Sequence, residues 1–367
     1  MGIRSHAKGT FHEYVEPGHE LETAQMHRVA ANKLIFNITF AWEHAVAITD
    51  EDDAGKLVSH RFPQFSLSDS LSPEFLQYVI LDEDFHHHLY LASPGGAGRN
   101  RVLKIKEALD YPIYYPSVNE QHKIGMYLDM LTYLITLHQR KYDMLQKVKK
   151  SMLEKMFPKN GSKVPEIRFD GFTDDWEQRK LGEVVQRITR KNENMESSLP
   201  LTISAQYGLI DQNEFFDKRI ASKDVSDYYL VYRGEFAYNK STSTDAPWGA
   251  IKRLDRYEKG VLSTLYIVFR IQNEEETDSD YLVSYYDTEL WHNGVQAIAA
   301  EGARNHGLLN IAPNDFFETN LLMPESVNEQ RMVGNFFKKL DHLITLHQRQ
   351  RILDLKWVFS AFSDMLE

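Results

Sequence analysis

Two stretches of the sequence carry apolar residues at alternating steps of four and three, which is the a/d pattern of a coiled-coil helix. The first runs from Ile124 to Leu145, and the second begins at Val333. The positions expected to face a partner helix are Leu128, Leu131, Ile135, His138, Phe337, Leu340, Ile344 and His347. Because two such stripes in one chain can cover each other, we expect two long helices packed as an antiparallel coiled coil.

Both predicted helices begin with the same signal. Ser117 is followed three places later by Glu120, and Ser326 is followed by Glu329. In such a capping box, the serine and the acidic side chain satisfy backbone amides that the first helical turn leaves unpaired. A helix of about forty residues is about 60 Å long. The pair would therefore form a rigid spacer.

The sequence also contains an internal repeat. Residues 117–121 (SVNEQ) recur at 326–330, and residues 134–140 (LITLHQR) recur at 343–349, both 209 places later. Weaker matches precede them at slightly smaller offsets, as expected where loops differ in length. We therefore expect two copies of one unit, each a variable domain of strands and helices followed by a long helix.

This organisation predicts an α+β protein with two domains separated by the helices. The expected boundaries are a first variable domain at 1–116, a central helix at 117–158, a second variable domain at 164–325 and a C-terminal helix at 326–367. An antiparallel helix pair would place the domains at opposite ends, around a pseudo-two-fold axis. Such a geometry suits a target with two half-sites.

Composition narrows the class of protein. Apolar residues make up 42% of the chain, and there is no cysteine for a disulfide, a thiolate zinc site or a nucleophile. No apolar run approaches a membrane span, and residues 1–20 lack the apolar core of a secretion signal. We expect a soluble cytoplasmic protein. Common catalytic motifs are also missing, so we expect no enzyme activity, metal or cofactor, and a stand-alone nuclease or methyltransferase is an unsupported alternative.

The net charge of −11 opposes DNA binding, because affinity for DNA comes largely from Lys and Arg that neutralise phosphates. Between His138 and Lys163, however, there are eight basic residues and two acidic ones. A summed potential can be positive along one groove of an acidic protein. The alternative for this stretch is a solvated basic helix face.

Residues 165–183 read PEIRFDGFTDDWEQRKLGE. This segment closely resembles the entry into a target recognition domain in the specificity subunit of type I restriction-modification systems. The resemblance extends through the second domain and its helix, and it covers the first helix equally well. Residues 93–100 (SPGGAGRN) also resemble a loop in one class of such domains.

The resemblance implies that each variable domain is a target recognition domain that reads half of a split site in double-stranded DNA. It further implies that the helices dock methyltransferase subunits, two of them, which use S-adenosylmethionine to modify adenine at N6. A motor-nuclease subunit could join for cleavage. The chain itself would be non-catalytic and would bind no cofactor.

The first unit departs from the repeat at its N-terminal end. The second unit begins near Val164, and the position 209 places earlier would lie before Met1. Roughly 35 to 45 residues at the start of the second unit therefore have no counterpart in the first unit. We expect the first target recognition domain to be N-terminally incomplete, through shortening or completion by another chain. The alternative function is a decoy that binds the methyltransferase without reading a full DNA site.

Candidate DNA contacts in the second domain lie on polar loops, because Arg, Lys, Asn, Gln, Ser and Thr match the hydrogen-bonding edges of bases. One loop follows the apolar run 236–239, and another repeats an Arg-Asn pair of the first domain, which favours phosphate anchoring. The candidates are Gln206, Tyr207, Lys240, Ser241, Thr242, Ser243, Arg304, Asn305 and His306. For any one of them, an ordinary polar turn is the alternative.

Candidates in the first domain fall in three segments. These are a Gly-flanked polar segment near the start of the chain, the end of a predicted strand, and the segment that contains the repeated Arg-Asn pair. The candidates are Arg4, His6, Lys8, Ser59, His60, Arg61, Arg99, Asn100 and Arg101.

Overall fold

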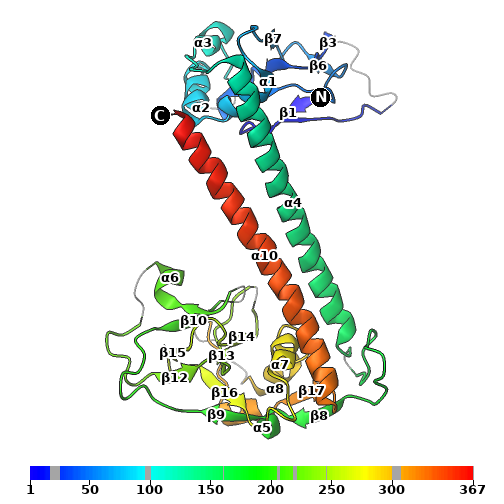
Figure 1. Ribbon diagram of the computed structural model, residues 1–367, viewed down its shortest axis with the longest axis vertical. Helices are drawn as coiled ribbons and strands as arrows, with labels where there is room; N and C mark the ends of the chain where they lie inside the picture. Colours follow the sequence, from blue (N-terminus) through cyan, green and yellow to red (C-terminus); the bar gives the residue numbers. More distant parts are fainter. Residues whose placement is uncertain are drawn as a thin grey trace. The chain divides into compact units, whose positions relative to one another are not determined.

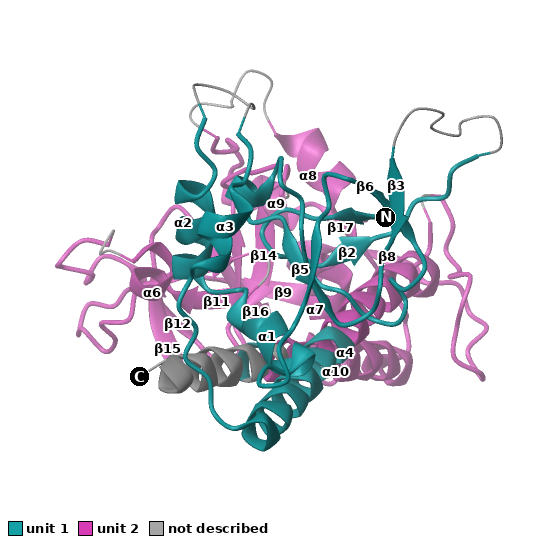
Figure 2. Cartoon of the chain, turned by 90° about the horizontal axis from the view of Figure 1, so that it is seen from above, with its two compact units in different colours: residues 1–137, 351–367 teal, residues 138–350 magenta. Residues whose placement is uncertain are grey.

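The computed structural model describes residues 1–16, 25–95, 101–159, 161–204, 207–217, 221–244, 246–299 and 307–366, with residues 351 and 354–366 described by their backbone. The chain divides into two compact units, which Figure 2 colours separately. Unit 1 comprises residues 1–137 and 351–367, and unit 2 comprises residues 138–350. Both units mix short strands with helices, which confirms the expected α+β class.

Unit 1 contains short antiparallel strands arranged as β1-β2, β3-β6 and β5-β4-β7. The strands are β1 (Gly2–Ile3), β2 (Thr10–Phe11), β3 (Met26–Arg28), β4 (Lys33–Phe36), β5 (Val46–Ile48), β6 (Leu57–Ser59) and β7 (Gln64–Ser66). The short helices are η1 (Ala41–Glu43), α1 (Pro73–Val79), α2 (Glu83–Leu91) and α3 (Ile105–Leu109). Helix α1 begins where Ser72 accepts a hydrogen bond from the amide of Phe75 and Pro73 occupies the first turn. It buries Leu76 against Phe36 and Leu89 in one core of the unit.

Unit 2 is organised around the antiparallel sheet β14-β13-β16-β9, with the pairs β10-β11, β12-β15 and β17-β8 beside it. The strands are β8 (Glu177–Lys180), β9 (Val185–Ile188), β10 (Leu201–Ser204), β11 (Gly208–Asp211), β12 (Tyr229–Tyr232), β13 (Phe236–Asn239), β14 (Ala250–Arg253), β15 (Lys259–Leu262), β16 (Ile267–Ile271) and β17 (Asn320–Met323). The short helices are α5 (Leu181–Val184), α6 (Gln212–Phe216), α7 (Ser279–Tyr286), α8 (His292–Ile298) and α9 (Pro313–Phe317).

The main core of unit 2 is rich in aromatic residues. Trp176, Tyr238, Phe269 and Tyr281 are almost wholly buried in it. The rings of Phe157 and Trp176 meet edge to face, with centroids 5.7 Å apart. Aromatic pairs in this arrangement add to the free energy gained by burying their area. Phe157 follows a long helix directly, so this core fixes the end of that helix to the domain.

The two expected long helices are present as α4 (Val118–Met156) and α10 (Val327–Leu366). Figure 1 shows both as single uninterrupted helices. Within unit 2 they run antiparallel: His138 contacts His347, and Lys149, further along α4, contacts Asp341, earlier on α10. Helix α10 buries the apolar positions Phe337, Leu340 and Ile344.

Each long helix begins with a buried glutamine that ties it to a short helix of its own unit. Gln121 accepts a hydrogen bond from the amide of Ser72, the residue that caps α1, and donates to the carbonyls of Ser70 and Pro116. Gln330 accepts from the amide of Asp278, which caps α7, and donates to the carbonyls of Glu276 and Pro324. The sequence repeat is therefore also a structural repeat.

A glycine four residues after each glutamine allows the helices to approach. A Cβ atom at Gly125 would lie 2.7 Å from the backbone carbon of Glu74, in α1. At Gly334 it would lie 2.6 Å from the backbone nitrogen of Tyr281, in α7. Such distances are too short for a real side chain, so both junctions require glycine.

The second predicted capping box is not what the structure shows. The Glu329 carboxylate, 2% exposed, accepts two hydrogen bonds from the Arg168 guanidinium, at 2.7 and 2.9 Å, and one from the Trp176 indole at 3.2 Å. An interaction with the segment before β8 has replaced the local cap. In unit 1 the equivalent Glu120 is exposed.

Candidate nucleic-acid interface

The loop between β13 and β14 is a hairpin connection whose described residues form turns. Its strands pair antiparallel, with Asn239 opposite Ala250. Asn239 accepts a hydrogen bond from the amide of Ser241, and Ser243 accepts one from the amide of Ala246. Asn and Ser side chains stabilise turns in this way. The hydroxyls of Ser241 and Ser243 belong to exposed residues, so they are available to a ligand.

A second segment, residues 307–311, holds this loop in place. The Thr242 amide and hydroxyl both donate to the carbonyl of Gly307, and the Lys240 amine donates to the carbonyl of Ile311 at 3.3 Å. Burial lowers the pKa of Lys240. Two of the four residues predicted here as DNA contacts therefore serve, in this structure, to position the loop.

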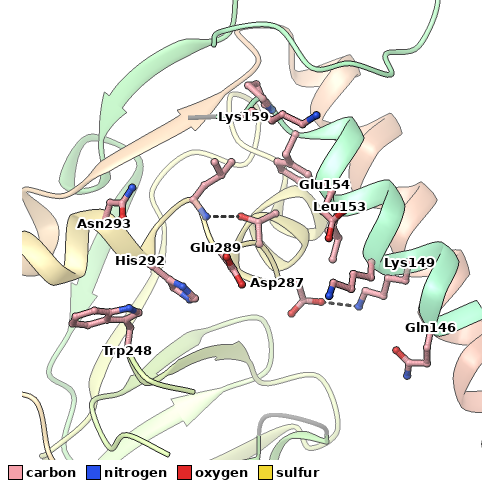
Figure 3. Close-up of a pocket in the computed structure, with 15 residues that line it drawn as sticks. Gln146, Lys149, Leu153, Glu154, Lys159, Trp248, Asp287, Glu289, His292 and Asn293 are labelled. Carbon is pink, nitrogen blue, oxygen red and sulfur yellow. Dashed lines mark hydrogen bonds and ion pairs between the residues drawn. The ribbon is translucent and has the colours of Figure 1, made fainter. Parts of the chain in front are cut away.

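A groove of about 1060 Å³ lies between the second half of α4 and the domain of unit 2. Figure 3 shows Lys149 and Lys159 on the α4 side and Trp248, from the end of the hairpin loop, on the domain side together with His292. Burial lowers the pKa of His292. The groove thus joins the polar loop to the basic stretch of α4.

One wall of the groove is an ion-pair network that fixes the domain to both long helices. Lys149 of α4 contacts Asp287, at the end of α7, at 2.7 Å and Asp341 of α10 at 2.6 Å, while Lys252 of β14 contacts Asp287 at 2.7 Å. Burial would raise the pKa of Asp287, but Lys252 and Lys149 outweigh it and lower that pKa to about 2. Burial dominates at Asp341 and raises its pKa. Lys149 is consequently a structural cation, whereas Lys150 also lines the groove and is exposed.

In unit 1 two of the predicted segments meet at one small core. Ile3, next to Arg4, and Val58, next to Ser59, belong to the same buried cluster, against which Phe62 packs. Arg4 donates to the carbonyl of Thr10 and lies over the Phe11 ring. The cationic and polar candidates His6, Lys8, His60 and Arg61 are exposed. The structure therefore brings these two segments together around one core of unit 1.

Arg101 is held elsewhere in unit 1. Its guanidinium lies 4.1 Å from the centre of the Tyr90 ring and donates to the Tyr90 hydroxyl at 2.9 Å. The guanidinium carbon also lies 5.8 Å from the centre of the Trp42 ring. A cation–π pair of this kind orients the side chain. The sequence offered no signal for it, because Trp42 and Tyr90 lie far from Arg101 along the chain.

The remaining candidates separate into three groups. Gln206, Arg99, Asn100, Arg304, Asn305 and His306 lie outside the described residues. Tyr207 is exposed. Of the helix positions, Leu128, Leu131, Phe337, Leu340 and Ile344 are buried, whereas Ile135, His138 and His347 are half-buried.

The described residues contain no cluster of three or more His, Cys, Asp or Glu side chains that could hold a metal ion. Within that same part of the chain, no helix has the length and apolar character needed to cross a membrane.

No protein-family model and no curated protein matches the chain. Among solved structures, the chain is similar to the type I restriction-modification system S subunit from M. genitalium, with a TM-score of 0.59 and 12% identity over 98% of this chain and 88% of that one. It also matches the HsdS subunit from Thermoanaerobacter tengcongensis with a TM-score of 0.43 and 15% identity, over 98% of this chain and 88% of that one. The first match shows a shared fold, and the second is too distant in structure to add to it.

Proposed function

We propose that this chain is a non-catalytic DNA sequence-recognition subunit of a type I restriction-modification complex. The observation that supports this most is the fold, which the chain shares over nearly its whole length with the M. genitalium S subunit. The segment 165–183 and the repeated helices favour the same assignment. In this proposal each unit carries a target recognition domain for one half of a bipartite site.

The hairpin loop of unit 2 is the proposed base-reading element. Its hydroxyl groups at Ser241 and Ser243 are exposed, and the hydrogen bonds to Gly307 hold the loop before DNA arrives. A preorganised loop loses less conformational entropy on binding. Along the adjoining groove, Lys150 would neutralise a phosphate, and Lys159 would do so by exchanging its partner Glu166 for one. The groove also carries Glu154, Asp287 and Glu289, so these lysines provide local phosphate contacts in a protein whose net charge is −11.

The proposed partners are double-stranded DNA and two methyltransferase subunits docked along the helices, with a motor-nuclease subunit as an optional addition. The methyl donor S-adenosylmethionine would be bound by the methyltransferase. The isolated chain should therefore show neither methylation nor cleavage of DNA.

Selection from a random DNA library tests the proposal. The chain, together with a type I methyltransferase subunit that it binds, should enrich a bipartite sequence with a fixed gap. Enrichment of one continuous site, or of no site, would contradict it.

Two sets of variants distinguish residues that recognise bases from residues that contact phosphates. Replacing Ser241 and Ser243 with Ala should change the preferred bases of one half-site. Lys150→Ala should weaken binding to all sequences alike and lower the slope of log affinity against log salt by about one. Lys339→Ala is the matched control, because Lys339 is an exposed lysine of α10 that does not line the groove.

A second candidate function is a subunit that occupies the methyltransferase without reading two half-sites. Glu120 and its surroundings are exposed in unit 1, whereas the equivalent Glu329 in unit 2 is buried. This difference favours the second candidate function. A gel-shift assay distinguishes the two candidates, since this second one predicts methyltransferase binding without a sequence-selective shift of DNA.

A further inference from the structure

The repeat allows the surface at the start of α4 to be compared, position by position, with the surface at the start of α10. In unit 2 the strand before the helix, β17, pairs antiparallel with β8. The segment leading into β8 then covers the helix itself: Arg168 and Trp176 bind Glu329, and the Phe169 ring meets the Phe336 ring edge to face at 6.5 Å.

The equivalent positions in unit 1 have no such cover among the described residues. Residues 112–115, which precede Pro116 as β17 precedes Pro324, are assigned to no strand. Tyr114 is 93% exposed. Glu120, the equivalent of Glu329, is exposed, and Tyr127, the equivalent of Phe336, is 44% exposed. The junction beneath is nevertheless complete, because Gln121 makes the same kinds of hydrogen bond as Gln330.

We propose that this surface, made of the backbone of residues 112–115 with the side chains of Tyr114, Glu120 and Tyr127 and called here the unit 1 docking surface, binds a segment of a separate protein chain. The segment has the chemistry of residues 168–180. It carries an arginine that pairs with Glu120, an aromatic residue that packs on Tyr127, and a short strand that pairs with residues 112–115. The proposal goes beyond the proposed function, because it concerns neither DNA nor the methyltransferase.

Two physical arguments favour this occupant. An unpaired row of backbone amides and carbonyls is a template for an added strand. An exposed glutamate beside an exposed tyrosine also complements an arginine followed by an aromatic residue, as Arg168 and Phe169 do in unit 2. The chain's own segment is not free to move across, because Trp176 is 1% exposed and β8 is paired.

The test uses the full chain and a fluorescent synthetic peptide of residues 163–183. Anisotropy titration should show saturable binding of one peptide per chain. Glu120→Arg in the chain should weaken binding about tenfold or more, as expected when an attractive charge pair becomes repulsive. Combining that variant with an Arg168→Glu peptide should restore binding. Glu107→Arg, at another exposed glutamate of unit 1, is the matched control and should change nothing.

Hydrogen exchange supplies the second measurement. The peptide should protect the amides of residues 113–115, and a peptide methylated on its backbone nitrogens at 177–180 should not. Absence of saturable binding would overturn the proposal. Binding unaffected by Glu120→Arg would also overturn it, because the peptide would then be replacing the chain's own segment in unit 2. A dimer of the chain that Glu120→Arg dissociates would also overturn the proposal, because segment 168–180 of a second copy is as buried as the chain's own and the occupant would then be another surface.

Discussion

The two units attach to their long helices through the same glutamine and glycine, yet they differ in what surrounds that contact. Unit 2 adds the ion pair of Arg168 with the buried Glu329 and the network around Asp287. Unit 1 adds hydrogen bonds from Tyr78 and Gln77 of α1 to Asp129 of α4, at 2.7 and 3.0 Å. The repeated residues therefore set where each domain meets its helix, while residues outside the repeat set how strongly it is held.

The largest expected difference between the units concerns the glutamates at 329 and 120. Arg168→Ala should lower the free energy of unfolding of unit 2 by about 3 kcal/mol or more, because it leaves a buried carboxylate without its cation. Glu120→Ala should change stability by about 0.5 kcal/mol or less, as for most exposed sites. Denaturant unfolding of the full chain, followed by hydrogen exchange of each unit, measures both. Equal effects would mean that the contacts of Arg168 with Glu329 of α10 contribute nothing to the stability of unit 2.

Substitutions of Gln121 and Gln330, by contrast, should have equal effects on the free energy of unfolding, because the two glutamines make the same kinds of hydrogen bond. Gln121→Leu and Gln330→Leu should each cost about 2 to 3 kcal/mol, because each removes three hydrogen bonds from buried or part-buried backbone groups. The same unfolding measurement applies, with Gln139→Leu, on the part of α4 in unit 2, as a control for helix propensity. A cost at Gln330 several times that at Gln121 would show that the two junctions are not energetically equivalent.

The sequence predicted the parts of this arrangement that repeat or follow a period. The long helices were predicted because apolar spacing at 3.5 residues is a property of the sequence alone. Gln121 and Gln330 were within the matched segments, so their equivalence was visible, although their role was not. The capping box at Glu329 was wrong because a tertiary partner, Arg168, competes with the local cap and no local pattern records it.

The candidate interface was less predictable. The groove depends on Lys149, Trp248 and Asp287, which are distant along the chain and meet only after folding. The polar run 240–243 predicted a loop. Its Lys240 and Thr242 side chains, however, donate hydrogen bonds to carbonyls of residues 307–311, which lie more than sixty places later in the sequence. Which residues of the loop stay exposed is thus a tertiary property.

The stability of unit 2 should fall at acidic pH because Asp287 becomes protonated. Its pKa in the folded protein, about 2, lies below the ordinary value of 3.8, so its contribution to stability is present above about pH 4 and is lost as the pH falls toward 2. The contribution is about 2 kcal/mol by linkage. The difference in unfolding free energy between the native chain and Asp287→Asn should shrink over that pH range. A difference that stays constant would show that the lysines do not lower this pKa.

The smallest expected effect concerns the two histidines where the helices pair within unit 2. The Nδ1 atoms of His138 and His347 are 2.9 Å apart, a distance that requires one ring to donate and the other to accept. Burial, His138 and Lys141 lower the pKa of His347, so stability from this contact is present above the ordinary histidine pKa of 6.5 and is lost as the pH falls below it. Helix pairing should weaken between pH 7.5 and 5, by no more than about 1 kcal/mol because the site is only half-buried. Hydrogen exchange across residues 340–350 measures this, and His347→Gln should remove the pH dependence because glutamine does not titrate. His342→Gln, at an exposed histidine of α10, is the control. If the pH dependence survived His347→Gln, another group would have to be responsible, and the repeated histidines would be packing residues like their apolar neighbours.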